Sequence, residues 1–344
     1  MKKIIPAIVL LFVFLVPSRA AAAYQIEVLQ VSRLDTYEEA YQGLLRGFER
    51  NGLSLGNDVQ INRTIIDTRP EAEPYTWENL RTLMKVKMIA GEIIDRKPQL
   101  VITIGTIATK YSRIKIVKAG IPFVFTCVEF PETVGCSSKT FSGQGFTGVT
   151  MYVDPRDFIR TARLGLPDMK KLGMIHSDDD YAVAYMEEAK KMAADLGLEV
   201  VSREVNLWEP INPAAEELLS QGVDTFFIPF DRYYRLKDFE RGKALAGILS
   251  AHRIPCISSM GKSIKGPLIS TFPDFTAMGG LAADQAAKIL TQGVKPEDLP
   301  VATPQGPAFF VDVEASRKLG IEIPVQLLQT AKPDAKQLVP HKGG

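Results

Sequence analysis

The chain is 344 residues long, 46% of its residues are hydrophobic, and its 41 basic and 40 acidic residues leave a formal net charge of +1. This length and hydrophobic content allow one large domain or two of about 150 residues, each with its own core. A charge balance this close to zero gives no overall electrostatic footprint for nucleic acid or anionic lipid, because both require clustered lysine and arginine.

Residues 1–23 have the composition of a secretory signal. A start with two lysines precedes an apolar run from Ile4 to Val16, and small residues follow it. The run is shorter than the roughly 20 residues of a membrane span, and no cysteine near the expected cleavage point could accept a lipid. Removal of this segment takes three of the 41 basic residues and none of the 40 acidic ones. We therefore expect a near-neutral, soluble periplasmic protein that is not a lipoprotein.

From Tyr24 onward, apolar strand-like runs alternate with helical patterns, which is typical of βαβ units and a parallel sheet. In the first series we expect strands at 26–31, 59–66, 100–104 and 123–126, with helices at 37–50, 80–96 and 108–118. Residues 69–77 interrupt this series with proline, glutamate and aromatic residues. We interpret them as a surface excursion, with a partner-binding loop as the alternative.

A second series has the same order of elements. It contains expected strands at 172–176, 199–205, 225–229 and 256–258, and expected helices at 182–196, 213–220 and 236–251. Asp154-Pro155 should begin a helix ahead of this series, because aspartate is a favoured N-cap and proline a favoured first helical residue. The doubled series predicts two α/β lobes of one topology.

The stretch GQGFTG at 143–148 has the G-x-G-x-x-G spacing of a dinucleotide-binding loop, but its flanks are in the wrong order. A nucleotide fingerprint follows a strand and opens a helix, so that the pyrophosphate meets the helix N-terminus. Here a polar loop precedes the glycines and the strand-like segment 149–153 follows them. We predict that no nucleotide or other cofactor binds here. Gly145 and Gly148 are instead expected to form a hinge or tight crossover between the lobes.

Four short stretches carry a family resemblance: Phe146–Val149, Leu166–Ile175, Lys190–Val201 and Leu319–Pro324. They resemble periplasmic ABC transporter substrate-binding proteins, a family that includes binders of aromatic amino acids. The resemblance implies a type I periplasmic binding fold, with two Rossmann-like lobes, hinge crossovers and a ligand cleft between the lobes. On this basis we assign residues 24–148 and 275–302 to lobe one, residues 149–274 and 303–326 to lobe two, and residues 327–344 to a disordered tail.

The resemblance also implies where the ligand binds, because the family holds it at the carboxyl ends of strands that face the cleft. The corresponding residues are Ser32, Thr106, Thr126 and Glu129 in lobe one, and Tyr181, Asp231, Arg232 and Asp274 in lobe two. Relatives commonly have Asn-Ser where this chain has Tyr181-Ala182, and Asp-Asn where it has Asp231-Arg232. The usual contacts to an amino-acid carboxylate are therefore altered.

Several of these residues also have an ordinary structural interpretation, which stays open at this point. Thr106 could hold a hydrogen-bond acceptor at a helix N-terminus or serve as a simple N-cap. Asp231 could pair with a ligand ammonium or with neighbouring Arg232 on a solvated helix start. The rings of Tyr181, Phe230 and Tyr233 could stack on a planar ligand or pack between the lobes.

The three adjacent acids Asp178–Asp180, beside His176, suggest a metal site at first sight. Three consecutive residues cannot all face one ion, and the helix dipole alone favours acids at this position. We therefore predict no metal. The motif H-E-x-x-H is absent from the sequence, and only two histidines, His176 and His252, lie outside the tail, so an enzyme is the least favoured class.

The three cysteines, Cys127, Cys136 and Cys256, cannot all pair within one chain. Cys127 and Cys256 lie in apolar runs, which favours buried free thiols. A bridge between Cys127 and Cys136 is the alternative in an oxidising compartment, and the sequence does not settle its geometry.

Together, these features predict the periplasmic solute-binding component of an ABC importer, which works as a monomer and delivers its ligand to an inner-membrane permease. Acidic residues outnumber basic ones in the implied site. An amino acid or related amine-bearing solute therefore suits the site better than phosphate or sulfate. The alternative is a periplasmic ligand-sensing module that signals to a membrane partner.

Overall fold

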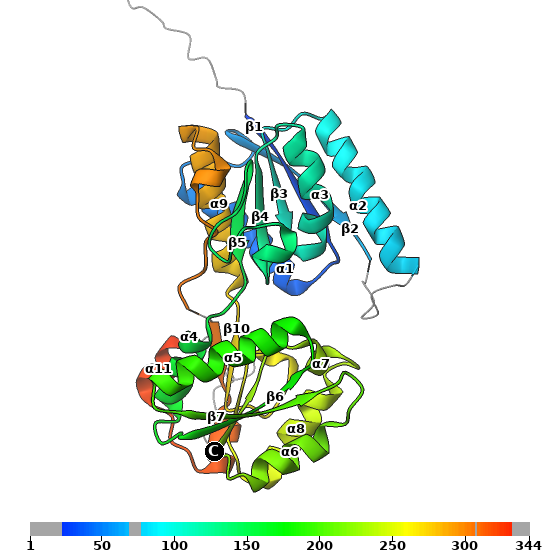
Figure 1. Ribbon diagram of the computed structural model, residues 1–344. Coiled ribbons are helices and arrows are strands. Elements are labelled where there is room, and N and C mark those ends of the chain that lie inside the picture. Colours follow the sequence, from blue (N-terminus) through cyan, green and yellow to red (C-terminus); the bar gives the residue numbers. More distant parts are fainter. Residues whose placement is uncertain (1–22, 69–76, 307, 332–344) are drawn as a thin grey trace, which may run out of the picture.

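The structure of the protein is a computed structural model that describes residues 23–68, 77–306 and 308–331. The described chain forms two α/β lobes, each built around its own sheet (Figure 1). The prediction of two α/β lobes is confirmed.

Lobe one has a five-stranded parallel sheet with the strand order β2-β1-β3-β4-β5. Its strands are β1 (Tyr24–Val31), β2 (Val59–Ile66), β3 (Leu100–Ile104), β4 (Phe123–Val128) and β5 (Phe146–Thr150). Helices α1 (Asp35–Arg50) and α9 (Phe275–Gln292) cover one face of the sheet, and α2 (Trp77–Asp95) and α3 (Thr106–Lys118) cover the other. Because both faces are covered, every residue of β3 is buried.

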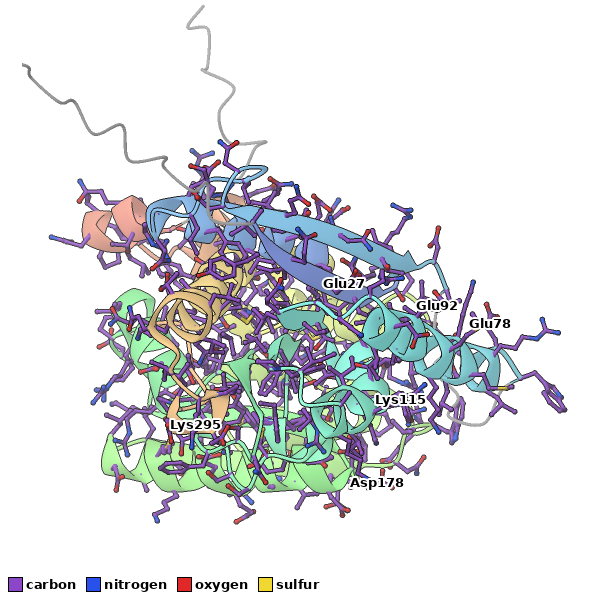
Figure 2. The ribbon with its side chains drawn as sticks, turned by 90° about the horizontal axis from the view of Figure 1, so that it is seen from above. Glu27, Glu78, Glu92, Lys115, Asp178 and Lys295 are labelled. Carbon is purple, nitrogen blue, oxygen red and sulfur yellow. The ribbon has the colours of Figure 1, made fainter. Side chains whose placement is uncertain are left out.

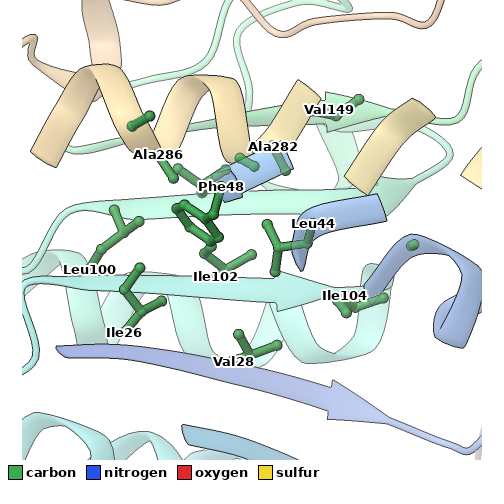
Figure 3. Close-up of a cluster of buried hydrophobic side chains, with 14 of the residues drawn as sticks. Ile26, Val28, Leu44, Phe48, Leu100, Ile102, Ile104, Val149, Ala282 and Ala286 are labelled. Carbon is green, nitrogen blue, oxygen red and sulfur yellow. The ribbon is translucent and has the colours of Figure 1, made fainter. Parts of the chain in front are cut away.

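The face under α1 and α9 has a dense apolar core, in which Leu44 and Phe48 of α1 lie against Ile102 of β3 (Figure 3). The two helices approach so closely that a Cβ at Gly279 of α9 would overlap the backbone carbonyl of Ala40 in α1. Glycine is required there because no side chain fits between the two backbones. This contact holds α9, which comes between two lobe-two strands in the chain, in lobe one.

Lobe two has a six-stranded sheet with the order β11-β10-β9-β8-β6-β7, in which only β11 is antiparallel to its neighbour. Its strands are β6 (Lys171–Ser177), β7 (Glu199–Val205), β8 (Thr225–Ile228), β9 (Cys256–Ser258), β10 (Ile269–Phe272) and β11 (Ala308–Val311). Its helices are α4 (Pro155–Gly165), α5 (Asp180–Asp195), α6 (Ile211–Ser220), α7 (Arg232–Arg235), α8 (Glu240–Ala251), α10 (Val313–Leu319) and α11 (Val325–Thr330). The cores on the two faces form around α4 and α5 and around α6 and α8.

Three segments of chain pass between the lobes. The first is 151–154, between β5 and α4, and the second is 273–274, between β10 and α9. The third begins after Ala302, which bridges to Val149 beside β5, and leads to β11 in lobe two. Near these crossings the carboxyl ends of strands from the two lobes face one another.

Most expected elements are present within a few residues, and the exceptions have local causes. The strand expected at 149–153 begins earlier, at Phe146, because the ring of Phe146 is buried in the lobe-one core. The helix expected at 236–251 begins later, as α8 at Glu240, because the three residues Lys237–Phe239 before it have positive φ angles of 49°, 52° and 62°. The short helix α7 before them was not predicted. Strands β10 and β11 were not predicted.

The expected disordered tail at 327–344 is wrong at its start. Residues 325–330 form α11, and Leu327 is buried in the lobe-two core beside Gly165 and Ile269. The remainder of the expected tail, at 332–344, lies outside the described residues, as do residues 1–22 of the expected signal and 69–76 of the expected surface excursion. Within the described ranges, no helix is both long and apolar enough to cross a membrane.

All three cysteines are free and buried, which confirms the prediction for Cys127 and Cys256. The alternative bridge between Cys127 and Cys136 does not form. Cys127 belongs to the core under α1 and α9, whereas Cys136 belongs to the core on the opposite face of the sheet. Burial raises the pKa of the Cys127 thiol to about 12, so it stays protonated at neutral pH.

Candidate ligand-binding cleft

A cavity of about 210 Å³ lies between the lobes, where strands of both sheets end. Lobe one contributes Glu129 and Phe130, which directly follow β4. The crossover contributes 151–153, and lobe two contributes residues at the ends of its strands and in the first turns of α5 and α7. This is where open α/β sheets bind ligands. The volume is below the roughly 300–1,000 Å³ of pockets for drug-sized ligands, so the cavity suits a small solute.

Four of the eight predicted ligand residues line this cavity: Glu129, Tyr181, Asp231 and Arg232. The carboxyl of Glu129 is the most perturbed of the acids. Burial raises its pKa from 4.5 to about 7; Arg235 opposes this shift, and the negative charges of Asp231 and Asp179 add to it. The surroundings of Glu129 therefore stabilise its negative charge poorly. A positive charge placed in the cavity would interact favourably with the ionised carboxylate.

Two aromatic rings meet across the cleft. Phe130 of lobe one stacks on Tyr181 in the first turn of α5 in lobe two, with ring centroids 4.3 Å apart and an interplanar angle of 16°. Tyr181 keeps 44% of its surface exposed in this arrangement. Each lobe thus presents a flat apolar face to the other, and such faces bind planar groups and cations well. Tyr233, by contrast, is fully buried and donates a hydrogen bond to the carbonyl of Glu209, so it packs within lobe two.

Asp231 has a structural function in addition to its place in the cavity. Its carboxylate accepts hydrogen bonds from the Ser177 backbone N–H at 2.7 Å, the Ser177 hydroxyl at 2.9 Å and the Tyr233 N–H at 2.8 Å. These bonds cap α7 and join the carboxyl ends of β6 and β8. The expected ion pair between Asp231 and a ligand ammonium stays a prediction, but these three donors already satisfy much of its charge.

Two more predicted residues, Ser32 and Thr126, make their contacts within lobe one. The Ser32 hydroxyl donates a hydrogen bond to the Thr68 carbonyl at 2.5 Å, and Thr126 is fully buried in β4. Ser32 directly follows β1, as expected, whereas Thr126 lies within β4, which continues to Val128, and neither lines the 210 Å³ cavity. Their role in ligand binding stays a prediction.

Thr106 and Asp274 both begin helices. The N-cap interpretation of Thr106 is wrong, because the N-cap of α3 is Gly105, whose φ of 94° favours glycine, and Thr106 is the first helical residue. Asp274 caps α9 by accepting a hydrogen bond from the Ala277 N–H at 3.0 Å. Neither residue lines the cavity, and a ligand contact from either stays a prediction.

The glycines of GQGFTG lie inside lobe one. Gly145 forms the turn before β5 with a φ of 77°, and a Cβ there would lie 2.7 Å from the side chain of Val117. Gly148 lies within β5, where a Cβ would overlap Phe125. A strand rather than a helix follows the first glycines, which is the order that argues against a nucleotide site. The hinge role of Gly145 and Gly148 stays a prediction, while close packing accounts for both.

A three-residue cluster that the sequence did not reveal links the lobes beside the crossover. Lys139 of lobe one pairs with Glu188 of α5 at 2.8 Å, and the hydroxyl of Tyr152 donates a hydrogen bond to the same carboxylate oxygen. The Lys139 ammonium also lies 3.8 Å from the centroid of the Tyr152 ring. Although burial opposes it, these contacts lower the pKa of Glu188 and keep it ionised. The cluster joins lobe one, the crossover and lobe two.

Phe130, Phe272 and Arg235 also line the cavity but were not predicted although a signal was available, whereas Phe230 was among the rings expected to stack on a ligand. Phe130 and Phe230 each follow a strand within two residues, and Phe272 ends β10, so aromatic residues mark three strand ends. Arg235 lies one helical turn after Asp231, and its guanidinium lies 5.2 Å from the Phe230 ring centroid. The acids at 178–180 do not gather around one point. Asp179 caps α5, and the described residues contain no group of three or more His, Cys, Asp or Glu side chains that could hold a metal ion.

The comparison with protein families assigns the chain. The model of the ABC transporter substrate binding protein family matches residues 25–334, which is nearly the whole chain. The protein belongs to this family. Members of this ABC transporter family bind a small-molecule substrate, are not enzymes, work with an ABC permease and are typically extracytoplasmic. A search of curated proteins finds no match.

Solved structures of substrate-binding proteins share the fold. A ligand-free, open substrate-binding protein with adhesive properties from Clostridium difficile is 19% identical, with a TM-score of 0.74 over 90% of this chain and 98% of that one. A Streptococcus pneumonia domain in complex with L-Trp is 20% identical, with a TM-score of 0.60 over 90% and 99% of the two chains. A periplasmic ribose ABC transporter protein from Conexibacter woesei is 13% identical, with a TM-score of 0.57 over 88% and 96%. The predicted type I periplasmic binding fold is confirmed.

Proposed function

We propose that the protein is the periplasmic solute-binding component of an ABC importer and that it captures an amino acid or a related amine-bearing solute between its lobes. In this proposal the signal segment directs export, and the free monomer delivers its ligand to a permease in the inner membrane. The observation that carries the ligand class is the carboxyl of Glu129, which lies in the interlobe cavity with a pKa raised to about 7.

The charges around the cavity support an amine. Glu129, Asp179 and Asp231 contribute three acids to its lining. Asp231 is already stabilised by three hydrogen-bond donors, so Glu129 is the carboxylate that gains most from a ligand ammonium. A desolvated pair of this kind loses several kcal/mol when one partner is removed.

The remaining lining supports a ligand that is planar and also carries an acidic group. Arg232 and Arg235 line the lobe-two side of the cavity, and their guanidinium groups suit a carboxylate. The paired rings of Phe130 and Tyr181 could separate to admit a flat group between them. The similar domain solved with L-Trp holds a ligand with these three features. An aromatic amino acid would therefore use every part of this site.

A ligand screen tests the proposal. Thermal-shift measurements should compare aromatic and aliphatic amino acids, aromatic amines, aromatic carboxylates without an amine, and sugars. The best ligand should then be titrated by calorimetry at pH 8 into the wild type, Glu129→Gln and the control Glu132→Gln, whose side chain is exposed outside the cavity. We expect Glu129→Gln to weaken binding by about 2 kcal/mol or more and the control to leave it unchanged. Tight binding of an amine-free anion that is indifferent to Glu129→Gln would refute the ligand class.

The importer role needs a cellular measurement. Deletion of the protein should abolish uptake of the labelled ligand at low concentration, and the wild-type chain should restore it. If uptake is unchanged while a transcriptional response to the ligand is lost, the sensing alternative is correct instead.

A further inference from the structure

Helix α2 presents an apolar ridge to solvent. Its large side chains Trp77, Leu80, Met84 and Met88 are 80%, 45%, 62% and 56% exposed. Their spacings of three, four and four residues place them along one side of the helix. The opposite side of α2 is also largely apolar and is buried in lobe one. Apolar side chains thus occupy two sides of the helix, and only one of these sides packs against the protein. A continuous row of four exposed large apolar residues requires an explanation that scattered single residues do not.

Helix α3 lies beside α2 on the same face of lobe one and extends this surface (Figure 1). The Lys115 ammonium of α3 donates a hydrogen bond to the backbone carbonyl of Lys87 in α2 at 3.4 Å. Ile114 of α3 is 54% exposed and adds a further apolar side chain. The two helices therefore form one outer surface.

The charge of this surface has a single sign. Residues 79–91 of α2 and 106–118 of α3 contain no acidic residue. Their exposed basic residues are Arg81, Lys85, Lys87, Lys110, Lys115 and Lys118. The acids Glu78 and Glu92 lie at either end of the α2 segment (Figure 2). The total charge of the chain is near zero, but this face carries a local cluster of basic residues. This face, unlike the chain as a whole, therefore has the clustered lysine and arginine that anionic lipid requires.

We propose that this α2–α3 surface, formed by the apolar ridge, Ile114 and the six exposed basic residues, docks onto the anionic lipid headgroups of the membrane. Lysine and arginine are attracted to an anionic surface, and tryptophan and other apolar side chains enter the boundary between headgroups and acyl chains. The long lysine stems allow apolar contact and charge contact in the same plane. Docking would hold the loaded protein close to the membrane that contains its permease.

Other occupants fit the surface less well. In a symmetric pair of copies this surface would meet the same surface of the second copy, so two clusters of six exposed basic residues would be brought together and would repel. A folded protein partner generally offers a shaped pocket to anchor residues. Here the apolar side chains form a ridge on the convex outside of a helix, which suits a fluid lipid surface.

Vesicle binding with matched charge reversals tests the proposal. The mature chain should be sedimented with vesicles of pure phosphatidylcholine and with vesicles that contain phosphatidylglycerol, at low and high salt. Lys85→Glu with Lys87→Glu alters the surface, whereas Lys288→Glu with Lys295→Glu makes the same charge change at exposed residues elsewhere. Lys288 lies on α9, which covers the opposite face of the lobe-one sheet, and Lys295 lies away from Lys115 of α3 in Figure 2. We expect salt-sensitive binding only with phosphatidylglycerol, a loss of about 30-fold or more for the first pair, and less than about threefold for the second.

Trp77 provides a direct reporter of contact, because the chain has only two tryptophans. The other, Trp208, is 71% exposed in lobe two and can be replaced by phenylalanine. With phosphatidylglycerol vesicles, emission from Trp77 should shift to the blue and be quenched by brominated lipid. Met84→Ser with Met88→Ser should reduce both effects while leaving the melting temperature close to that of the wild type.

Three results would overturn the proposal. The first is the absence of vesicle binding, and the second is an equal loss for both charge-reversal pairs. The third is binding without any change in Trp77 emission. If polyglutamate binds as tightly as the vesicles and also leaves Trp77 unchanged, the occupant is an acidic polypeptide instead of lipid.

Discussion

Replacing Glu129 with glutamine should change how the stability of the protein depends on pH. Burial raises the pKa of this carboxyl from 4.5 to about 7 in the folded protein. One unit of pKa corresponds to about 1.36 kcal/mol, so the full effect would be about 3 kcal/mol. Glu129 is only partly buried and lines the cleft, so solvent screens part of this effect, and we expect about 1–2 kcal/mol. Between pH 4.5 and 7 the folded state binds more protons than the unfolded state. The contribution is thus complete below pH 4.5 and is lost as the pH rises through 7.

Urea unfolding of the ligand-free protein at pH 5, 6, 7 and 8 measures this effect. The wild type, Glu129→Gln and the exposed control Glu132→Gln should be compared at each pH, because other titrating groups then cancel in the differences. Relative to the wild type, Glu129→Gln should gain about 1–2 kcal/mol of unfolding free energy between pH 5 and pH 8, and the control should gain nothing. A difference for Glu129→Gln that stays constant across this range would show that Glu129 is ionised in the folded state, and the reasoning would fail.

Four further predictions concern the fold and its motion. Glu188→Gln removes an interlobe ion pair and should lower the free energy of unfolding by about 1 kcal/mol. The control Glu187→Gln removes a more exposed ion pair and should lower it by less than about 0.5 kcal/mol. Equal effects would contradict a role for the interlobe cluster. Gly279→Ala should destabilise the protein by about 2 kcal/mol or more because the new Cβ would meet the α1 backbone. Gly247→Ala, in open space on α8, should leave the melting temperature unchanged or raise it slightly. Similar shifts of the melting temperature for both variants would argue against close packing at Gly279. Small-angle scattering should show compaction when the screened ligand binds, and an unchanged profile would mean that the lobes do not close on it. NAD and ATP should leave the melting temperature unchanged, since a ligand of 143–148 present at 100 times its Kd would add about 2.7 kcal/mol.

The sequence alone determined most of the elements up to β9 and their order, because those signals are local. Asp154 caps α4 by accepting a hydrogen bond from the Arg156 N–H, as the Asp-Pro pair predicted. The buried strands appear as apolar runs because helices cover both faces of each sheet. Glu129 and Tyr181, which the family resemblance implied at the ends of strands, both line the interlobe cavity.

Only the tertiary structure decided what each of these side chains contacts. The bonds between Ser177 and Asp231 join residues 54 positions apart, and they depend on the register of β6 and β8, which no local pattern reveals. The separation of Cys127 from Cys136 depends on which face of the sheet each one enters. The raised pKa of Glu129 depends on how both lobes bury it and on charges from lobe two. Backbone hydrogen bonding and hydrophobic periodicity act over a few residues, whereas burial, charge pairing and close packing depend on segments that meet only after folding.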